Sequence, residues 1–281
     1  MYEIIVGLIM GLVEGLTEFA PVSSTGHMII VDDLWLNIDQ LFNKEVSITF
    51  MVVIQLGSIL AAVIVFKDRF MDILGIRKLQ GKTEQLPGKQ GKFSLGIVIT
   101  GLIPAAVLGF LVQDMVDNYL FSIITVIAAL IAGAILMLVA DRHTKKHPPT
   151  VESLDELTYK KAFMIGLFQC IALWPGFSRS GSTISGGVLL GLNHRVASDF
   201  TFIMAVPVMA GASALTLIKH LDAFTPDVIP FFVAGFISAF VFALLAIRTF
   251  LKIISKYKLV PFAIYRIVLA AVLLVVVLAA S

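Results

Sequence analysis

The sequence predicts an all-α integral membrane protein built from two inverted repeats, with six transmembrane helices and two re-entrant helix–turn–helix pairs. Of its 281 residues, 58% are hydrophobic and 14% are charged, whereas soluble domains have about 45–50% and about 25%. Six apolar stretches are long enough to cross a membrane. Two polar turns, each flanked by apolar stretches too short to cross, interrupt the remainder. These three observations indicate the fold class.

The six long stretches have the length of about 20 residues that a helix needs to cross the hydrocarbon. They cover residues 46–66, 95–113, 120–140, 200–218, 229–250 and 260–280. Four shorter stretches form two pairs, each joined by one polar turn: 4–19 with 27–36, and 162–174 with 182–192. Pairs that enter and leave on the same side fit these lengths, because irregular backbone at membrane depth must be buried or line a wet cavity. Crossing by all ten stretches is the alternative, and it requires unusually short spans.

Segments of the two halves align in the same order. The aligned pairs are Pro21–Gly26 with Pro175–Ser180, Phe50–Gly57 with Phe202–Met209, and Gly101–Ala106 with Gly235–Phe240. The closing spans correspond as well. Three spans in each half invert the second half relative to the first, a plan that places a site at the midplane. We expect one membrane domain over 1–281, with repeat one at about 1–140, a cytoplasmic linker at about 141–161 and repeat two at about 162–281.

The distribution of basic residues predicts the orientation in the membrane. Loops 67–92, 141–161, 193–199 and 248–259 fall on one side and carry 17 of the 21 Lys and Arg residues. By the positive-inside rule this side is cytoplasmic. Both termini are then outside, the first re-entrant pair enters from outside and the second from the cytoplasm, so that their tips can meet. The net charge of +2 gives no reason to expect a nucleic-acid partner.

The first polar turn, Glu14–His27, carries two acids four residues apart. On a helix, Glu14 and Glu18 lie one turn apart on the same face. Two close carboxylates in a low dielectric repel, which favours a bound cation, and Mg²⁺ and Ca²⁺ prefer oxygen ligands. One carboxylate could instead act as a general base. The alternative is a pair of unrelated acids that reach the membrane surface.

Hydroxyl groups and a histidine follow these acids. Ser23, Ser24 and Thr25 supply three hydroxyls, and His27 begins the next helix. A Ser-Ser-Thr run is often no more than a helix N-cap. Beside a base, however, a hydroxyl is typical of an activated nucleophile. We therefore interpret Glu18, Ser24 and His27, together with Glu14, as catalytic, and Ser23 and Thr25 as substrate-binding.

The second polar turn, Pro175–Thr183, has the composition of an anion site. Its glycines and serines allow successive amides to point one way at the start of a helix from about residue 182, and such sites attract phosphate. Arg179 stays protonated and can bind a phosphate through two parallel hydrogen bonds. The other predicted substrate-binding residues of this turn are Ser178, Ser180 and Thr183. A structural salt bridge from Arg179 to Glu14 or Glu18 is the alternative.

Together the two turns predict phosphoryl transfer to a serine or to water inside a membrane. The substrate is then a lipid phosphate or pyrophosphate. A transporter or lipid flippase, suggested by the inverted repeats, is the second hypothesis, although it has less need of Ser24 and His27 beside two carboxylates. Both activities could coexist at one midplane site. A purely structural subunit leaves both turns unexplained.

The two turns resemble the two signature motifs of the bacterial undecaprenyl-diphosphate phosphatases, the bacitracin-resistance family. The matching motifs are Glu-Gly-Leu-Thr-Glu-Phe-Ala-Pro-Val-Ser-Ser-Thr-Gly-His and Pro-Gly-Phe-Ser-Arg-Ser-Gly-Ser-Thr. The likeness extends over the whole chain, including Val53–Ala61 and Pro261–Arg266. It implies hydrolysis of undecaprenyl diphosphate to the monophosphate carrier of cell-wall synthesis, in the bacterial plasma membrane, at a site open to the outer side.

The resemblance also implies roles for individual residues. Glu14 and Glu18 match the family's acidic pair, tied to a divalent cation and catalysis. Ser24 and His27 match its two candidate nucleophiles, of which we favour Ser24, with a phosphohistidine on His27 as the alternative. Arg179 matches the phosphate-binding arginine and Thr183 the threonine that closes this motif. The sequence leaves the oligomeric state open, a homodimer included.

Overall fold

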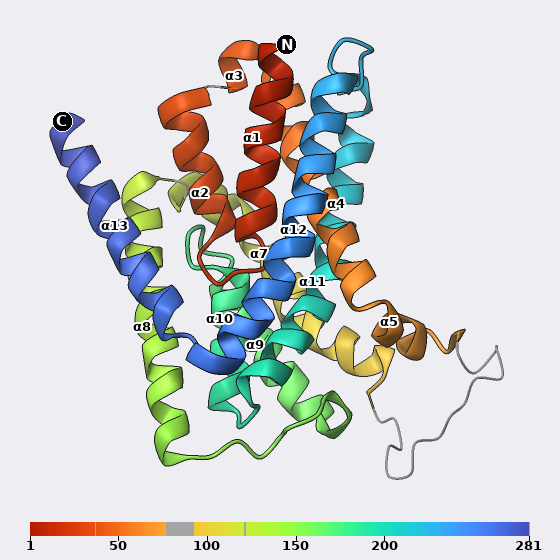
Figure 1. Cartoon of the computed structure of the whole chain (residues 1–281), viewed down its shortest axis with the longest axis vertical. Helices are drawn as coiled ribbons and strands as arrows, with labels where there is room; N and C mark the ends of the chain where they lie inside the picture. The colour runs from red at the N-terminus through yellow and green to blue at the C-terminus, as the bar shows by residue number, and fades with distance from the viewer. Residues whose placement is uncertain (37, 77–92, 121, 281) are drawn as a thin grey trace. The chain divides into compact units, whose positions relative to one another are not determined.

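The computed structural model describes residues 1–36, 38–76, 93–120 and 122–280, and within these ranges the regular secondary structure is helical apart from one isolated bridge between Val151 and Leu192. Among the described residues, six helices are long and apolar enough to cross a membrane (Figure 1). They are α4 (Lys44–Val65), α7 (Leu95–Tyr119), α8 (Ile123–Lys146), α11 (His194–Lys219), α12 (Ile229–Tyr257) and α13 (Val260–Ala280). The all-helical class and the six expected spans are confirmed.

The four shorter apolar stretches form two helix–turn–helix pairs. The first pair is α1 (Tyr2–Thr17) with α2 (Ser24–Val31), and the second is α9 (Tyr159–Ile171) with α10 (Arg179–Leu189). Their re-entrant placement in a bilayer stays a prediction. The remaining elements are the π-helical turn η1 (Asp32–Leu36), the short helices α3 (Ile38–Leu41) and α5 (Lys67–Ile73), and the 3₁₀ turns η2 (Leu154–Glu156) and η3 (Leu221–Ala223). Most of the predicted loop 67–92, from residue 77 on, lies outside the described residues.

Four helices extend well beyond the apolar stretches that predict them. Helix α7 continues to Tyr119, α8 to Lys146 and α12 to Tyr257, and α11 begins at His194. The extensions of α8, α11 and α12 fall in the loops that are rich in basic residues. Backbone hydrogen bonds continue a helix whether its side chains are apolar or charged. Basic residues in the last turn of α8 also interact favourably with the negative end of the helix dipole.

The chain divides into two compact units. Unit 1 comprises Met1–Val65 and Ala205–Lys252, and unit 2 comprises Phe66–Met204 and Ile253–Ser281. Each unit therefore combines segments from both halves of the sequence. The first polar turn belongs to unit 1 and the second to unit 2, so each turn is described within its own unit.

In unit 1, α1 packs closely on α12 and α4. A Cβ atom at Gly11 would collide with the carbonyl oxygen of Gly235, so only a glycine permits this approach of α1 to α12. Phe50 of α4 and Phe231 of α12 stack with ring centroids 3.9 Å apart. Val6 and Met10 of α1 lie fully buried in the same core. The packing holds the end of α1, and hence its two glutamates, against neighbouring helices.

Unit 2 contains an equivalent close approach. Helix α9 packs on α7, where a Cβ atom at Gly166 would collide with the carbonyl oxygen of Gly101. The sequence alignment pairs Gly101 with Gly235. The first helix of each helix–turn–helix pair thus meets equivalent glycines of α7 and α12. This likeness supports an internal repeat, while the inverted orientation of the repeats stays a prediction.

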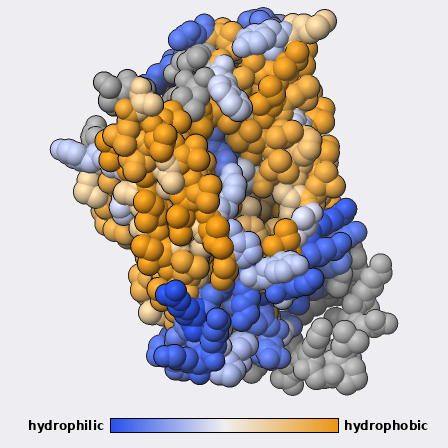
Figure 2. Space-filling model, turned by 60° about the vertical axis from the view of Figure 1, so that its left-hand side comes forward, coloured by the Kyte–Doolittle hydropathy of each residue, from blue (hydrophilic) through white to orange (hydrophobic). Residues whose placement is uncertain are grey.

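The surface is apolar over wide areas. Figure 2 shows hydrophobic residues over most of the face in view, with hydrophilic residues gathered along its lower part. Large apolar side chains that are exposed include Phe110, Leu111, Val275 and Leu278. Such a surface is favourable against lipid, and it would be costly against water.

Candidate active site

The first turn reverses the chain between α1 and α2 and ends at a serine in an unusual conformation. Ser23 has φ 73° and ψ 90°, a left-handed backbone region that a residue with a Cβ seldom adopts. Its Oγ accepts a hydrogen bond from the amide of Gly26 at 3.3 Å and caps α2. The predicted helix from 27 therefore begins at Ser24, because Ser23 supplies the cap. The structural role observed for Ser23 is this cap, and its contact with substrate stays a prediction.

Ser24 and Glu18 are brought together by this turn. The Ser24 Oγ donates a hydrogen bond to Oε2 of Glu18, from the first residue of α2 to the residue that follows α1. Ser24 is buried and Glu18 is half-buried. A carboxylate that accepts the proton of a serine hydroxyl has the geometry of a general base acting on a nucleophile. Thr25 lies half-buried beside Ser24.

The hydrogen bond of His27 fixes which of its ring nitrogens is protonated. Nδ1 lies 2.7 Å from the carbonyl oxygen of Ser23. Because a carbonyl oxygen only accepts, Nδ1 must carry a proton. In the neutral ring the lone pair is then on Nε2, the nitrogen that can accept a proton or attack phosphorus. The same turn that caps α2 therefore sets the tautomer of His27.

Glu14 and Glu18 form the acidic end of α1. Glu14 is fully buried, and its carbonyl oxygen accepts the amide of Glu18 at 2.9 Å, which places the residues one turn apart. The C-terminus of a helix is the negative end of its dipole, and the last turn of α1 has no basic residue. A positive charge near these two carboxylates would therefore be strongly stabilising.

The carboxylates of Glu14 and Glu18 suit Mg²⁺ better than Ca²⁺. No group of three or more His, Cys, Asp or Glu side chains that could hold a metal occurs within the described residues. A closed calcium cage needs six to eight oxygen ligands. Magnesium is commonly bound by one or two carboxylates, together with water and substrate phosphates. Glu14 and Glu18 fit this second pattern.

The second turn repeats the backbone conformation of the first. Ser178 has φ 74° and ψ 116°, and its Oγ accepts the amide of Gly181 at 3.1 Å to cap α10. Ser178 is thus equivalent to Ser23, and Gly181 to Gly26. The structural register is one residue away from the sequence alignment, which matched the prolines and paired Ser178 with Ser24. The amide of Gly181 is used by the cap, so a phosphate ligand would depend on other donors of this turn.

Arg179 is the first residue of α10, three residues earlier than the predicted start, and its side chain is half-buried. Ser180 is buried, and its Oγ lies 3.2 Å from the Oγ of Ser178. Thr183 is fully buried: its hydroxyl donates to the carbonyl oxygen of Arg179 at 2.8 Å and accepts from Thr201 at 2.9 Å. The observed contact of Thr183 is therefore with the backbone of Arg179, and contact with substrate stays a prediction.

Arg266 is a buried residue next to the second turn whose contacts the sequence did not reveal. It lies in α13, is fully buried, and donates to carbonyl oxygens of the second turn and of α8. A signal was available, because a charged residue in an apolar span is costly and commonly marks a functional site. Its partners are backbone carbonyl groups, which no side-chain pattern identifies.

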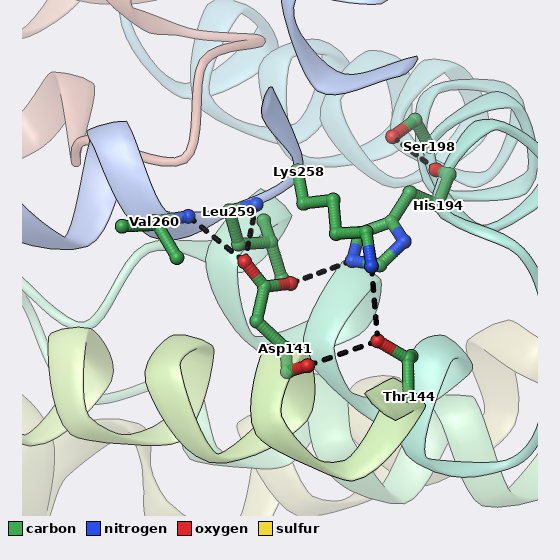
Figure 3. Close-up of polar contacts among 7 residues, drawn as sticks. All are labelled: Asp141, Thr144, His194, Ser198, Lys258, Leu259 and Val260. Atoms are coloured by element: carbon green, nitrogen blue, oxygen red, sulfur yellow. Dashed lines mark hydrogen bonds and ion pairs between the residues drawn. The ribbon is translucent and has the colours of Figure 1, made fainter. Parts of the chain in front are cut away.

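A second buried polar cluster fixes the start of α13 (Figure 3). One oxygen of Asp141 in α8 lies 2.6 Å from Nε2 of His194 in α11. Its other oxygen accepts the amides of Leu259 and Val260, each at 2.9 Å. This cluster joins α8, α11 and α13 within unit 2, and the sequence motifs gave no indication of it.

Comparison with known proteins covers nearly the whole chain. Residues 7–272 match the family described as Bacitracin resistance protein BacA. A protein of Bacillus subtilis strain 168 named undecaprenyl-diphosphatase is 59% identical over 98% of this chain and 99% of its own length. A protein of the same name from Geobacillus kaustophilus is 61% identical over 95% of both chains, and one from Bacillus velezensis is 56% identical over 99% of both.

Proposed function

We propose that this chain, which belongs to the bacitracin resistance protein BacA family, hydrolyses undecaprenyl diphosphate. The products are undecaprenyl phosphate and inorganic phosphate. It is a multi-pass membrane protein of bacteria. The product is the lipid carrier that returns to cell-wall synthesis, and its recycling confers resistance to bacitracin. The hydrogen bond from Ser24 to Glu18 is the single observation that carries the chemical proposal.

The reaction follows from the groups of the first turn. The Oγ of Ser24 attacks the terminal phosphorus, and Glu18 takes the hydroxyl proton. The bond between this phosphorus and the bridging oxygen breaks, and undecaprenyl phosphate leaves. Water then attacks the phosphoserine, and Nε2 of His27 accepts a proton of the water. The bond between phosphorus and Oγ breaks, Glu18 returns its proton to Oγ of Ser24, and inorganic phosphate leaves. Attack by Nε2 of His27, which would form a phosphohistidine, is the alternative that the tautomer also permits.

The second turn supplies the positive charge for the substrate. Arg179 binds the diphosphate through its guanidinium group, and the hydroxyl of Ser178 contributes a further hydrogen bond. The carbonyl group of Arg179 is held by Thr183 from the following turn of α10, which restricts the backbone that carries the guanidinium.

Glu14 and Glu18 would hold a divalent cation, with Mg²⁺ favoured by the number of protein ligands. When bound, it neutralises negative charge on the diphosphate and on the leaving phosphate. The buried carboxylate of Glu14 at the negative end of α1 supports this proposal, because a cation offsets the repulsion between the two acids.

The orientation in the membrane follows the positive-inside rule. The extensions of α8 and α12 carry basic residues into the side proposed as cytoplasmic. Both termini then lie outside, and the site opens to the outer face. Cysteine substitutions at Ser281 and at Lys146, labelled in intact cells with an impermeant thiol reagent, test this: only the cysteine at 281 should react. Cys170 is first replaced by Ala.

The activity is tested with the purified chain in detergent and undecaprenyl diphosphate as substrate. The wild-type protein should release inorganic phosphate without a membrane gradient, which a pure carrier would not do. Glu18→Ala and Arg179→Ala should each abolish release while the proteins elute as the wild type does. Near-normal turnover in a folded variant would remove that residue from the mechanism. Arg195→Ala, a change in an exposed ion pair with Asp199, is the matched control and should keep activity.

A further inference from the structure

We propose that Arg266 is a positioning residue: its guanidinium group holds the carbonyl oxygens of Gly176 and Phe177 and so fixes the backbone that presents Ser178 and Arg179 to phosphate. This inference rests on the proposed function, because it assigns a role within the same site. It adds a residue of α13, 87 positions after Arg179 in the sequence.

The hydrogen bonds of Arg266 form a bridge between two backbones. Toward the second turn, its two terminal nitrogens donate to Phe177 at 2.8 Å and to Gly176 at 3.0 Å. Toward α8, Nη2 also donates to the carbonyl oxygen of Ala129 and Nε donates to that of Leu130, both at 3.1 Å. A planar guanidinium group with a fixed fork geometry can make all four bonds at once. The turn is thereby tied to a long helix.

The two bonds to the turn lie directly before the residue with the unusual conformation. Gly176 and Phe177 precede Ser178, whose positive φ angle directs the chain into α10. A backbone held in a sparsely populated region persists only when its surroundings determine it. Arg266 supplies such a constraint on one side of Ser178, and the hydroxyl cap to Gly181 supplies another on the other side.

The position of Arg266 is itself fixed at the start of α13. Asp141 binds the amides of Leu259 and Val260, as Figure 3 shows, and Asp141 lies on α8, the same helix that carries Ala129 and Leu130. Arg266 follows Leu259 by seven residues, or about 10 Å along a helix. Helix α13 is thus anchored to α8 at two points about two turns apart, and it reaches the turn from there.

Gly133 provides the space for the guanidinium group. A Cβ atom at this position of α8 would collide with the guanidinium of Arg266 and lie 2.8 Å from the carbonyl oxygen of Phe177. A Gly133→Ala substitution therefore displaces the contact without removing the charge. It provides a second, independent variant. Gly211→Ala is the matched control, because a Cβ atom at Gly211 meets nothing within 4 Å.

The experiment measures KM and kcat for undecaprenyl diphosphate in detergent for Arg266→Lys, Gly133→Ala and Gly211→Ala. Lysine keeps the charge but has no planar fork, so it cannot replace all four bonds. We expect Arg266→Lys and Gly133→Ala to raise KM about tenfold, as the loss of charge-assisted hydrogen bonds implies, and Gly211→Ala to leave KM unchanged. In an Arg179→Lys background, Arg266→Lys should raise KM less than twofold further, because both residues act through one clamp.

The split between KM and kcat separates positioning from stability. A purely structural role would lower the amount of active protein, and so the apparent kcat, while leaving KM unchanged. The inference is overturned if KM stays within twofold of wild type in both variants, with or without a lower apparent kcat. It is also overturned if the effects of Arg266→Lys and Arg179→Lys on KM are fully additive. Failure of both variants to fold would also overturn it, since the role would then be structural. The proposed function fails separately, if the wild-type protein releases no phosphate.

Discussion

Replacing Ser24 or Ser23 by alanine tests the choice of nucleophile with a pair of adjacent hydroxyls. The two serines have different contacts: Ser24 donates to Glu18, whereas Ser23 caps α2 through the amide of Gly26. Ser24→Ala removes the attacking oxygen and leaves the cap intact. Ser23→Ala removes the cap and leaves the contact of Ser24 with Glu18 intact. The bond from His27 survives in both, because its acceptor is a backbone carbonyl oxygen.

The two substitutions are expected to reduce stability and catalytic rate by different amounts. Loss of an N-cap costs about 1 kcal/mol of stability, so Ser23→Ala should lower the thermal midpoint slightly and reduce the rate less than about tenfold. Ser24→Ala removes the nucleophile together with the proton transfer to Glu18. We expect kcat to fall at least about 10³-fold, equivalent to about 4 kcal/mol in the activation free energy.

The assay is phosphate release from undecaprenyl diphosphate by purified variants at matched concentrations of folded protein. Acid-quenched wild-type enzyme, given substrate labelled in the terminal phosphate, should also carry acid-stable label, since a phosphoserine survives acid and a phosphohistidine does not. Equal and mild losses in the two variants would refute the serine mechanism. So would label that acid removes and that His27→Asn abolishes.

Three further predictions concern the metal, the buried carboxylate and the close helix approach. Chelation of divalent cations should abolish phosphate release, and Mg²⁺ should restore it. Glu14→Gln should raise the Mg²⁺ concentration needed for half-maximal rate. A rate insensitive to chelator would contradict the metal proposal. Asp141→Ala should lower the free energy of unfolding by about 2–5 kcal/mol, because buried amides and His194 lose their acceptor, and an unchanged thermal midpoint would argue against the cluster. Gly166→Ala should cost about 1–3 kcal/mol through collision with Gly101, measured by the same thermal shift, with Gly211→Ala expected to show no loss.

The six spans were predictable because hydropathy over about 20 residues depends on composition alone. The predicted ends of the helices were less accurate. The sequence placed the end of the third span at residue 140 and α8 ends at Lys146, because charged residues continue a helix as readily as apolar ones outside the membrane. Similarly, α10 begins at Arg179 rather than at about 182, because the cap of Ser178 satisfies an amide of the first turn.

The candidate site was predictable where side chains identify chemistry, and it was not where the backbone does. The spacing of Glu14 and Glu18 places both at one end of α1. The pairing of Ser24 with Glu18 needed the turn geometry, since six residues separate them. The partners of Arg266 are four carbonyl oxygens, and every residue has one. The alignment of the turns failed by one residue for a related reason: it matched prolines, whereas Ser23 and Ser178 share a φ angle.

The contacts of Arg266 have a consequence for biogenesis. Helix α13 is synthesised after α8 and the second turn, and an arginine in an apolar span costs about 2.5–3.5 kcal/mol to insert. The four carbonyl oxygens that receive it belong to α8 and the second turn, which are already synthesised by then. Insertion of α13 and completion of the second turn are therefore coupled steps. A chain that stops before residue 266 leaves the carbonyl oxygens of Gly176 and Phe177 without the guanidinium group that binds them.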